Sequence, residues 1–200
     1  MYFFLIALIT VGRVSAQSVI TLAEYEANNN PSSGQSGVGV AADVSGTGIT
    51  RNGVSFASGT NYSATGFTTS LSPNTSEYFQ VTVAPLSGYK ISVTHILLNF
   101  VRDANGPHSI QLRTNADNFG SAILIDGAIQ TTSGGDGLDL SGIANLQNIT
   151  TTATFRIYGY QASATSGVLF AYPYPGYTAH LLPTGKTAGV VLQGKVATAP

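Results

Sequence analysis

The feature that most constrains the fold of this chain is a strict two-residue alternation of apolar and polar side chains between Tyr78 and Thr114. The apolar residues occupy odd positions in segments 79–83 and 89–93, and even positions in 110–113. Successive side chains of a β-strand point to opposite faces, so this period indicates strands with one buried and one solvent-exposed face. Three such segments in succession predict a β-sheet protein.

The same pattern extends over the rest of the chain, where short alternating runs bounded by Gly, Pro, Asn and Ser recur and no amphipathic helical period lasts three turns. The apolar parity changes between Val93 and Ile96, which predicts a bulge or corner at Thr94-His95. No linker divides the chain, so we expect a single domain over residues 17–200, an all-β, jelly-roll-like antiparallel β-sandwich. The expected strands are 18–25, 37–44, 67–69, 77–83, 89–93, 96–101, 109–114, 122–125, 152–160, 167–171 and 188–196.

Residues 1–16 predict a secretory signal peptide. The apolar run from Tyr2 to Val11 is too short for a membrane span of about 20 residues, and Val14-Ser15-Ala16 places small residues at the cleavage positions. Cleavage before Gln17 would leave a secreted or cell-surface chain with no membrane span. The alternative is a buried N-terminal strand, whose large apolar side chains would need cover.

The charge balance limits the partners of this chain. Charged residues make up 8% of it, against a typical ~25%. Without the leader, seven Lys and Arg residues face nine Asp and Glu residues, which argues against nucleic acid because its binding needs a clustered basic face. A polar, nearly uncharged surface approaches another neutral surface at little desolvation cost, which suits glycans or self-association. With no Cys, the domain must be held by its core alone.

No residue pattern indicates an enzyme. The three histidines, His95, His108 and His180, are scattered, and neither a Cys nor a G-x-S-x-G elbow offers a nucleophile. Glu24 and Glu26 lie on one face of an expected strand, but neighbours on one strand are not the facing pair that glycoside hydrolysis needs. We therefore expect a non-enzymatic protein without catalytic residues or a cofactor.

Two acidic segments are candidates for a structural calcium ion. Asp103 with Asn105, and Asp136 with Asp139, offer the carboxylate and carbonyl oxygens that Ca²⁺ prefers. Neither segment has the spacing of a complete calcium loop, so ordinary Asx turns are the alternative.

Arg102, Arg113 and Arg156 all occupy polar positions of expected strands in a chain with few charges. One interpretation is that they pair with Asp103 or Asp117 and pin loops to the sheet, since Arg forms bidentate bonds with carboxylates. The other is a ligand face on which Arg binds a sugar together with exposed aromatic rings, against which sugar C–H groups can stack. The tyrosine candidates for such contacts are Tyr158, Tyr160, Tyr172, Tyr174 and Tyr177.

Most of segment 37–160 resembles an exported bacterial domain found in proteins with C-terminal sorting tails of the PEP-CTERM or type IX secretion type. The resemblance implies a jelly-roll-like sandwich displayed outside the cell, and it implies no particular activity. The Tyr-Pro-Tyr-Pro-Gly-Tyr run at 172–177 departs from the family, which has an acidic residue there. The matching segments, in the family's order, are 37–42, 46–48, 63–68, 77–83, 88–93, 100–102, 105–107, 112–114, 117–119 and 155–160, followed by 189–196 as the last strand.

Two hypotheses of function follow. The first is a structural or adhesive module of the cell surface or extracellular matrix, which assembles with itself or with other surface proteins. In its filament form, residues 18–26 leave their own sandwich and complete a neighbour's sheet. The second is a carbohydrate-binding module that contacts extracellular glycans through Tyr, Arg and Asn side chains.

Overall fold

The computed structural model describes residues 17–200, so the predicted signal peptide lies outside the described residues. Within this part the chain forms strands and two short 3-10 helices, and every strand pairing is antiparallel, which confirms the predicted fold class. The elements are β1 (Ile20–Glu26), β2 (Val38–Val40), β3 (Val44–Asn52), β4 (Ser55–Phe56), β5 (Ser63–Thr65), β6 (Tyr78–Pro85), β7 (Tyr89–Leu98), β8 (Phe100–Arg102), β9 (Pro107–Thr114), η1 (Asn115–Asp117), β10 (Leu124–Asp126), β11 (Asp136–Asp139), η2 (Ala144–Leu146), β12 (Ala153–Ala162), β13 (Val168–Ala171) and β14 (Ala188–Thr198).

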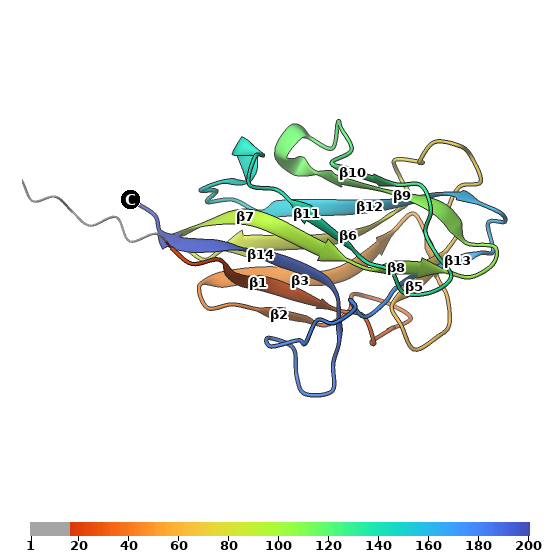
Figure 1. Ribbon diagram of the computed structural model, residues 1–200, viewed down its shortest axis with the longest axis horizontal. Coiled ribbons are helices and arrows are strands. Elements are labelled where there is room, and N and C mark those ends of the chain that lie inside the picture. Colours follow the sequence, from red (N-terminus) through yellow and green to blue (C-terminus); the bar gives the residue numbers. More distant parts are fainter. Residues whose placement is uncertain (1–16) are drawn as a thin grey trace, which may run out of the picture.

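The strands form three sheets. Sheet A has the order β11-β7-β14-β1-β2, sheet B the order β10-β9-β12-β6-β3, and the smaller sheet C the order β4-β5-β13-β8. Figure 1 shows the strands of A and B running along the long axis of the molecule. β1, the strand that the filament hypothesis would exchange, is an interior strand paired with β14 and β2 on its two sides. Strand exchange therefore requires both ladders to break, and it stays a prediction.

The hydrophobic core fills the space between sheets A and B. Sheet A contributes the fully buried Tyr25 and Ile91, and sheet B contributes Phe79 and Phe155. The hydroxyl of Tyr25 crosses the core and donates to the carbonyl oxygen of Thr82 at 2.9 Å, which ties the two sheets together. Each fully buried large apolar side chain contributes about 1.5–3 kcal/mol. This core takes the place of the disulfides that the chain lacks.

The predicted irregularity at Thr94-His95 is a bulge. β7 runs without interruption, and opposite it Gln193 of β14 pairs with His95 while the next residue, Gly194, pairs with Val93. Thr94 is thus the extra residue, and it explains why the apolar parity of the sequence changes at this point.

The sequence analysis missed four strands, β3, β4, β5 and β11, of which β4 and β5 are only two and three residues long. β3 was not predicted because Gly46 and Gly48 interrupt its alternation; a Cβ at Gly48 would collide with the backbone of Ser36. β11 was expected to be part of a loop, yet it pairs along β7 as an edge strand of sheet A. The reverse error is segment 67–69, which was expected to be a strand but lies outside the named strands.

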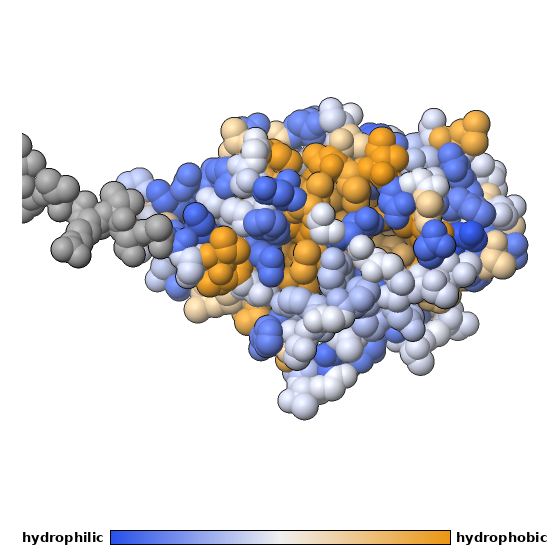
Figure 2. All heavy atoms as spheres, viewed as in Figure 1, coloured by the Kyte–Doolittle hydropathy of each residue, from blue (hydrophilic) through white to orange (hydrophobic). Residues whose placement is uncertain are grey.

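Apolar atoms reach the surface near β10 and β11, the edge strands of sheets B and A (Figure 2). Leu124 and Leu138 of these strands are partly buried against the core, and Ile125 is 61% exposed. Asp126 and Asp136 on the same short strands place charges there, which disfavours pairing with another chain. Among residues 17–200, no helix is long and apolar enough to cross a membrane.

Candidate functional site

The outer face of sheet B brings two of the three predicted arginines together. The register places Arg156 of β12 between Arg113 of β9 and Gln80 of β6. Phe155 and Ile157, the chain neighbours of Arg156, are buried in the core. Because side chains alternate between faces, the arginine side chains point away from the core.

The guanidinium of Arg156 lies between two aromatic rings. Its Cζ is 4.4 Å from the ring centroid of Tyr78 and 3.7 Å from that of Phe119, which are cation–π distances. Its Nε donates to Oε1 of Gln80 at 3.0 Å. Among residues 17–200, neither Nη atom of Arg156 has a hydrogen-bond partner. The guanidinium is therefore held in place, and the Arg156 side chain is partly exposed.

Arg113 is held beside it by different contacts. Its Nε and Nη2 donate to Oε1 of Gln111 at 3.2 and 2.9 Å, and its Nη1 donates to the carbonyl oxygen of Phe119 at 3.2 Å. Its Cζ lies 5.2 Å from the ring centroid of Tyr158, which packs tilted against Tyr78 at 5.3 Å. We call this set the arginine face: Tyr78, Gln80, Gln111, Arg113, Phe119, Arg156 and Tyr158.

Phe119 takes part in this face through an unusual backbone. It follows η1, and both it and the preceding Asn118 have positive φ, 61° and 58°. The left-handed region costs a residue with a Cβ about 1–2 kcal/mol, and Asn tolerates it better than Phe does. This conformation lays the Phe119 ring on Arg156 and turns its carbonyl oxygen toward Arg113. Strain of this kind concentrates at functional sites.

No carboxylate of the described residues neutralises the arginine face. The one ion pair among residues 17–200 joins Nζ of Lys186 to Oε1 of Glu26 at 2.6 Å. The interpretation that the arginines pair with Asp103 or Asp117 is therefore wrong: Oδ1 of Asp103 accepts the backbone N–H groups of Asn105 and Val168 instead. Asp117 accepts the backbone N–H of Ser121.

Arg102 lies away from this face, on β8 in sheet C, and it pins loops through carbonyl oxygens rather than carboxylates. Its Nε donates to Ile129, and its Nη1 donates to Asp103 and Ala104. Arg102 thus holds loops in place as the first interpretation expected, although without a carboxylate partner, and Arg113 likewise bonds the loop carbonyl oxygen of Phe119.

Tyr158 and Tyr160 do not offer exposed rings. They are 1% and 5% exposed, so the expectation that they stack on a sugar is wrong. Tyr78 and Arg113 lie against Tyr158, and segment 68–70 lies beside the end of β12, where it accepts hydrogen bonds from two β12 amides. Tyr158 forms the floor of the arginine face rather than a platform for a ligand.

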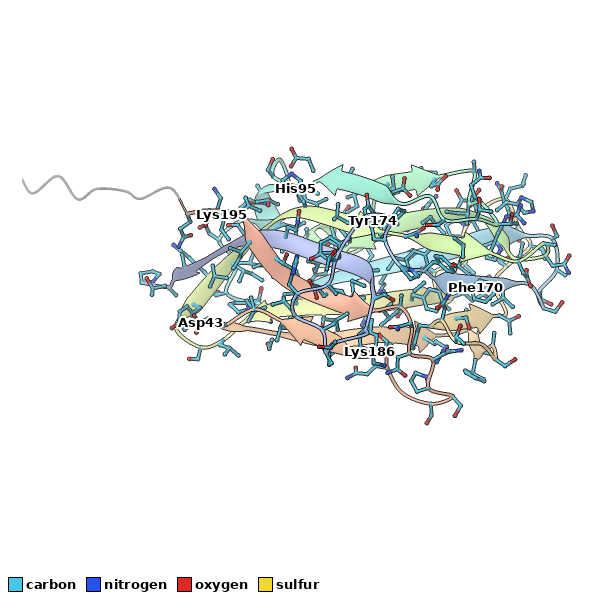
Figure 3. All side chains as sticks on the ribbon, turned by 60° about the horizontal axis from the view of Figure 1, so that its bottom comes forward. Asp43, His95, Phe170, Tyr174, Lys186 and Lys195 are labelled. Atoms are coloured by element: carbon cyan, nitrogen blue, oxygen red, sulfur yellow. The ribbon has the colours of Figure 1, made fainter. Side chains whose placement is uncertain are left out.

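Tyr172, Tyr174 and Tyr177 belong to a different surface. They lie in segment 172–187, which we call the strap and which crosses the outer face of sheet A; Figure 3 labels Tyr174 and Lys186 on it. Tyr172 is partly exposed, and Tyr174 packs near Gly135. The hydroxyl of Tyr177 donates to Oε1 of Glu24 at 2.7 Å. Burial and this hydrogen bond raise the pKa of Tyr177 to about 12.

Glu24 anchors the strap, a role that the sequence did not reveal. Its carboxylate is fully buried and accepts backbone N–H groups of His180, Leu181 and Leu182 at 2.8–3.1 Å. Burial raises the pKa of Glu24, but these bonds and that from Tyr177 outweigh burial, so the net pKa lies below its usual value. The feature that could have indicated this role is the presence of a charged glutamate within a strand that is otherwise buried.

The calcium candidates are not brought together. Oδ1 of Asp103 accepts the N–H of Asn105, which is an Asx turn, while Asp136 and Asp139 lie on β11. Among residues 17–200, no three His, Cys, Asp or Glu side chains are close enough to hold a metal ion. Structural calcium stays a prediction.

No residue of the arginine face lines a described hollow of the surface, although a hollow of about 250 Å³ lies beside the face on sheet B, where Gly46 and Thr82 line it. Two larger hollows lie elsewhere. One of about 610 Å³ is formed by strap residues, including Tyr177 and Lys186. Another of about 380 Å³ lies on the outer face of sheet A beside Lys90 and Lys195. Neither is lined by a pair of carboxylates, so neither offers the acid and base of a hydrolase.

The fold and this face define an antiparallel β-sandwich protein with an open, arginine-bearing sheet surface. No protein-family model matches the sequence, and no curated protein matches it. Among solved structures, a family 29 carbohydrate-binding module from Piromyces equi is similar to this chain, with a TM-score of 0.40 and 8% identity over 88% of this chain and 91% of that one. A likeness at this level identifies neither a family nor a ligand.

Proposed function

We propose that this protein is a non-enzymatic, exported β-sandwich that binds a polysaccharide through the arginine face. The observation that carries the proposal is the Arg156 guanidinium, which is held between two rings while its Nη atoms have no partner among residues 17–200. Donors fixed in this way lose little conformational entropy when they bind sugar oxygens. Binding to an extracellular polysaccharide is also one way in which a surface protein can adhere.

The openness of the face favours a polymer over a small molecule. Its residues come from the adjacent strands β9, β12 and β6 and from the loop that holds Phe119. Small ligands are usually enclosed in concave pockets, and no residue of the face lines any of the hollows described above, including the one beside it on sheet B. An extended chain can instead lie along a sheet surface and contact several residues in turn.

The test compares two variants that each remove one positive charge. Arg156→Gln changes the arginine face, and Lys195→Gln changes the outer face of sheet A. Wild-type protein and both variants are applied to an array of plant, algal and microbial polysaccharides, and their folding is checked by circular dichroism. We expect wild type and Lys195→Gln to bind the same polysaccharides and Arg156→Gln to bind at least tenfold more weakly. Equal binding by folded Arg156→Gln, or no binding by wild type, would contradict the proposal.

A further inference from the structure

We propose that the arginine face recognises sugar carboxylates, so that its ligands are acidic polysaccharides built from uronates. This inference rests on the proposed function and adds to it the chemical class of the ligand. Three features of the face carry it: an uncompensated pair of charges, the amides that support that pair, and aromatic rings whose faces are already in use.

The first feature is the direct opposition of two like charges. Arg113 and Arg156 are cross-strand partners on neighbouring antiparallel strands. Like charges at directly opposed positions destabilise a sheet, and no carboxylate of residues 17–200 pairs with either arginine. The whole chain has eight Lys and Arg residues and a net charge of −1. A bound anion would relieve this local repulsion, whereas the protein as a whole does not attract anions.

The second feature is the neutral side chain that supports each arginine. Gln80 accepts the Nε–H of Arg156, and Gln111 accepts two N–H groups of Arg113. Glutamate at either position would make the same contact and cancel the charge. Glutamine instead orients each guanidinium and leaves its charge in place. The Nη atoms of Arg156 then present two parallel donors, the arrangement that binds a carboxylate in a bidentate manner.

The third feature separates an acidic sugar from a neutral one. Neutral sugars stack on free aromatic faces, but here Tyr78 and Phe119 each present a face to Arg156, and Tyr158 is buried beneath Arg113. The rings therefore hold cations rather than sugars. The strained backbone at Phe119 maintains this arrangement, which presents guanidinium groups to the ligand.

The decisive experiment is a charge-matched pair of variants. Gln80→Glu places a carboxylate beside Arg156, and Gln193→Glu makes the same chemical change on β14 of sheet A. Affinity electrophoresis measures binding of wild type and both variants to polygalacturonate and alginate, to the methyl ester of each polymer, and to dextran sulfate. Thermal unfolding of each protein is measured in parallel.

We expect wild type to bind at least one uronate polymer, its methyl ester at least tenfold more weakly, and dextran sulfate no better than the uronate. Gln80→Glu should lose at least tenfold in affinity while unfolding at the same or a higher temperature, and Gln193→Glu should stay within twofold of wild type. The carboxylate that Gln80→Glu introduces pairs with Arg156 inside the protein and preserves the fold. Weaker binding by this variant therefore reflects the neutralised charge and not unfolding.

Each other outcome overturns a distinct statement. Equal binding of acid and ester contradicts carboxylate recognition and leaves the proposed function intact, and stronger binding of dextran sulfate contradicts carboxylate recognition in favour of sulfate. An equal loss in Gln193→Glu shows diffuse electrostatic attraction and overturns the assigned site. Failure to bind uronates while neutral polymers bind overturns the inference alone, and failure to bind any polysaccharide overturns the proposed function as well.

Discussion

Replacement of Glu24 by Gln tests whether a buried carboxylate holds the strap on sheet A. The carboxylate accepts four donors: the hydroxyl of Tyr177 and the N–H groups of His180, Leu181 and Leu182. Hydrogen bonds to a charged group contribute about 1.5–3 kcal/mol each, against about 1 kcal/mol for neutral ones. Gln removes the charge and turns an N–H₂ group toward donors that need an acceptor.

We expect Glu24→Gln to lower the free energy of unfolding by about 2–4 kcal/mol, a large part of the 5–15 kcal/mol typical of a domain. For a domain of this size that is a decrease of roughly 5–12 °C in Tm. Urea denaturation at pH 7, followed by circular dichroism, measures the loss. The matched control is Glu77→Gln. Oε1 of Glu77 accepts an exposed hydrogen bond from Asn74, and its buried Oε2 has no hydrogen-bond partner among residues 17–200, so removal of this charge should lower stability by less than about 0.5 kcal/mol.

The pH dependence of this difference provides a second check. The pKa of Glu24 is lower in the folded state than its ordinary value of 4.5. The carboxylate therefore contributes its full stability above pH 4.5, and that contribution is lost as the pH falls through the lower, folded-state pKa. The difference between wild type and Glu24→Gln should shrink below pH 4.5. A difference below 0.5 kcal/mol at pH 7, or one that grows on acidification, would refute the reasoning.

Two further substitutions test other parts of the fold. Arg51 donates to the carbonyl oxygens of Ser63 and Pro31, and its Cζ lies 3.9 Å from the ring centroid of Tyr62, so Arg51→Ala should lower stability by about 2–3 kcal/mol. Arg51→Lys should recover less than half of that loss in the same urea titration, and full recovery would show that charge alone matters. Gly194→Ala introduces a Cβ that collides with the carbonyl oxygen of Ser92 at the bulge; a loss of at least about 2 kcal/mol is expected, and a variant as stable as wild type would contradict this packing.

Much of the fold could be predicted because its signals are local. The alternation of apolar residues in β6, β7, β9 and β12 reflects the pleat of a strand, which depends on nearest neighbours in the chain. The bulge at Thr94 was visible as a change of parity for the same reason. β3 and β11 were missed because glycines and aspartates, which normally mark turns, lie in them, and their place in a sheet depends on distant partners.

The candidate site could be predicted only in part. Arg113, Arg156 and Tyr158 were named from their polar or aromatic character on strands, and the structure gathers them on one face. The contacts that hold them were not visible: Gln80 is 76 residues from Arg156. Phe119 was missed as well, because its contact with Arg156 depends on a left-handed backbone that the sequence does not favour for phenylalanine.

The sequence by itself determined that this protein is an all-β sandwich with one polar and one apolar side to most strands, since that alternation is a local property of the chain. Only the tertiary structure decided which charges have partners. Arg102 bonds loop carbonyls and Glu24 is enclosed by backbone amides, while Arg113 and Arg156 face each other with no paired carboxylate in the part of the chain that the structure describes. These differences arise from strand register and loop conformation, because both bring together residues that are far apart in the sequence.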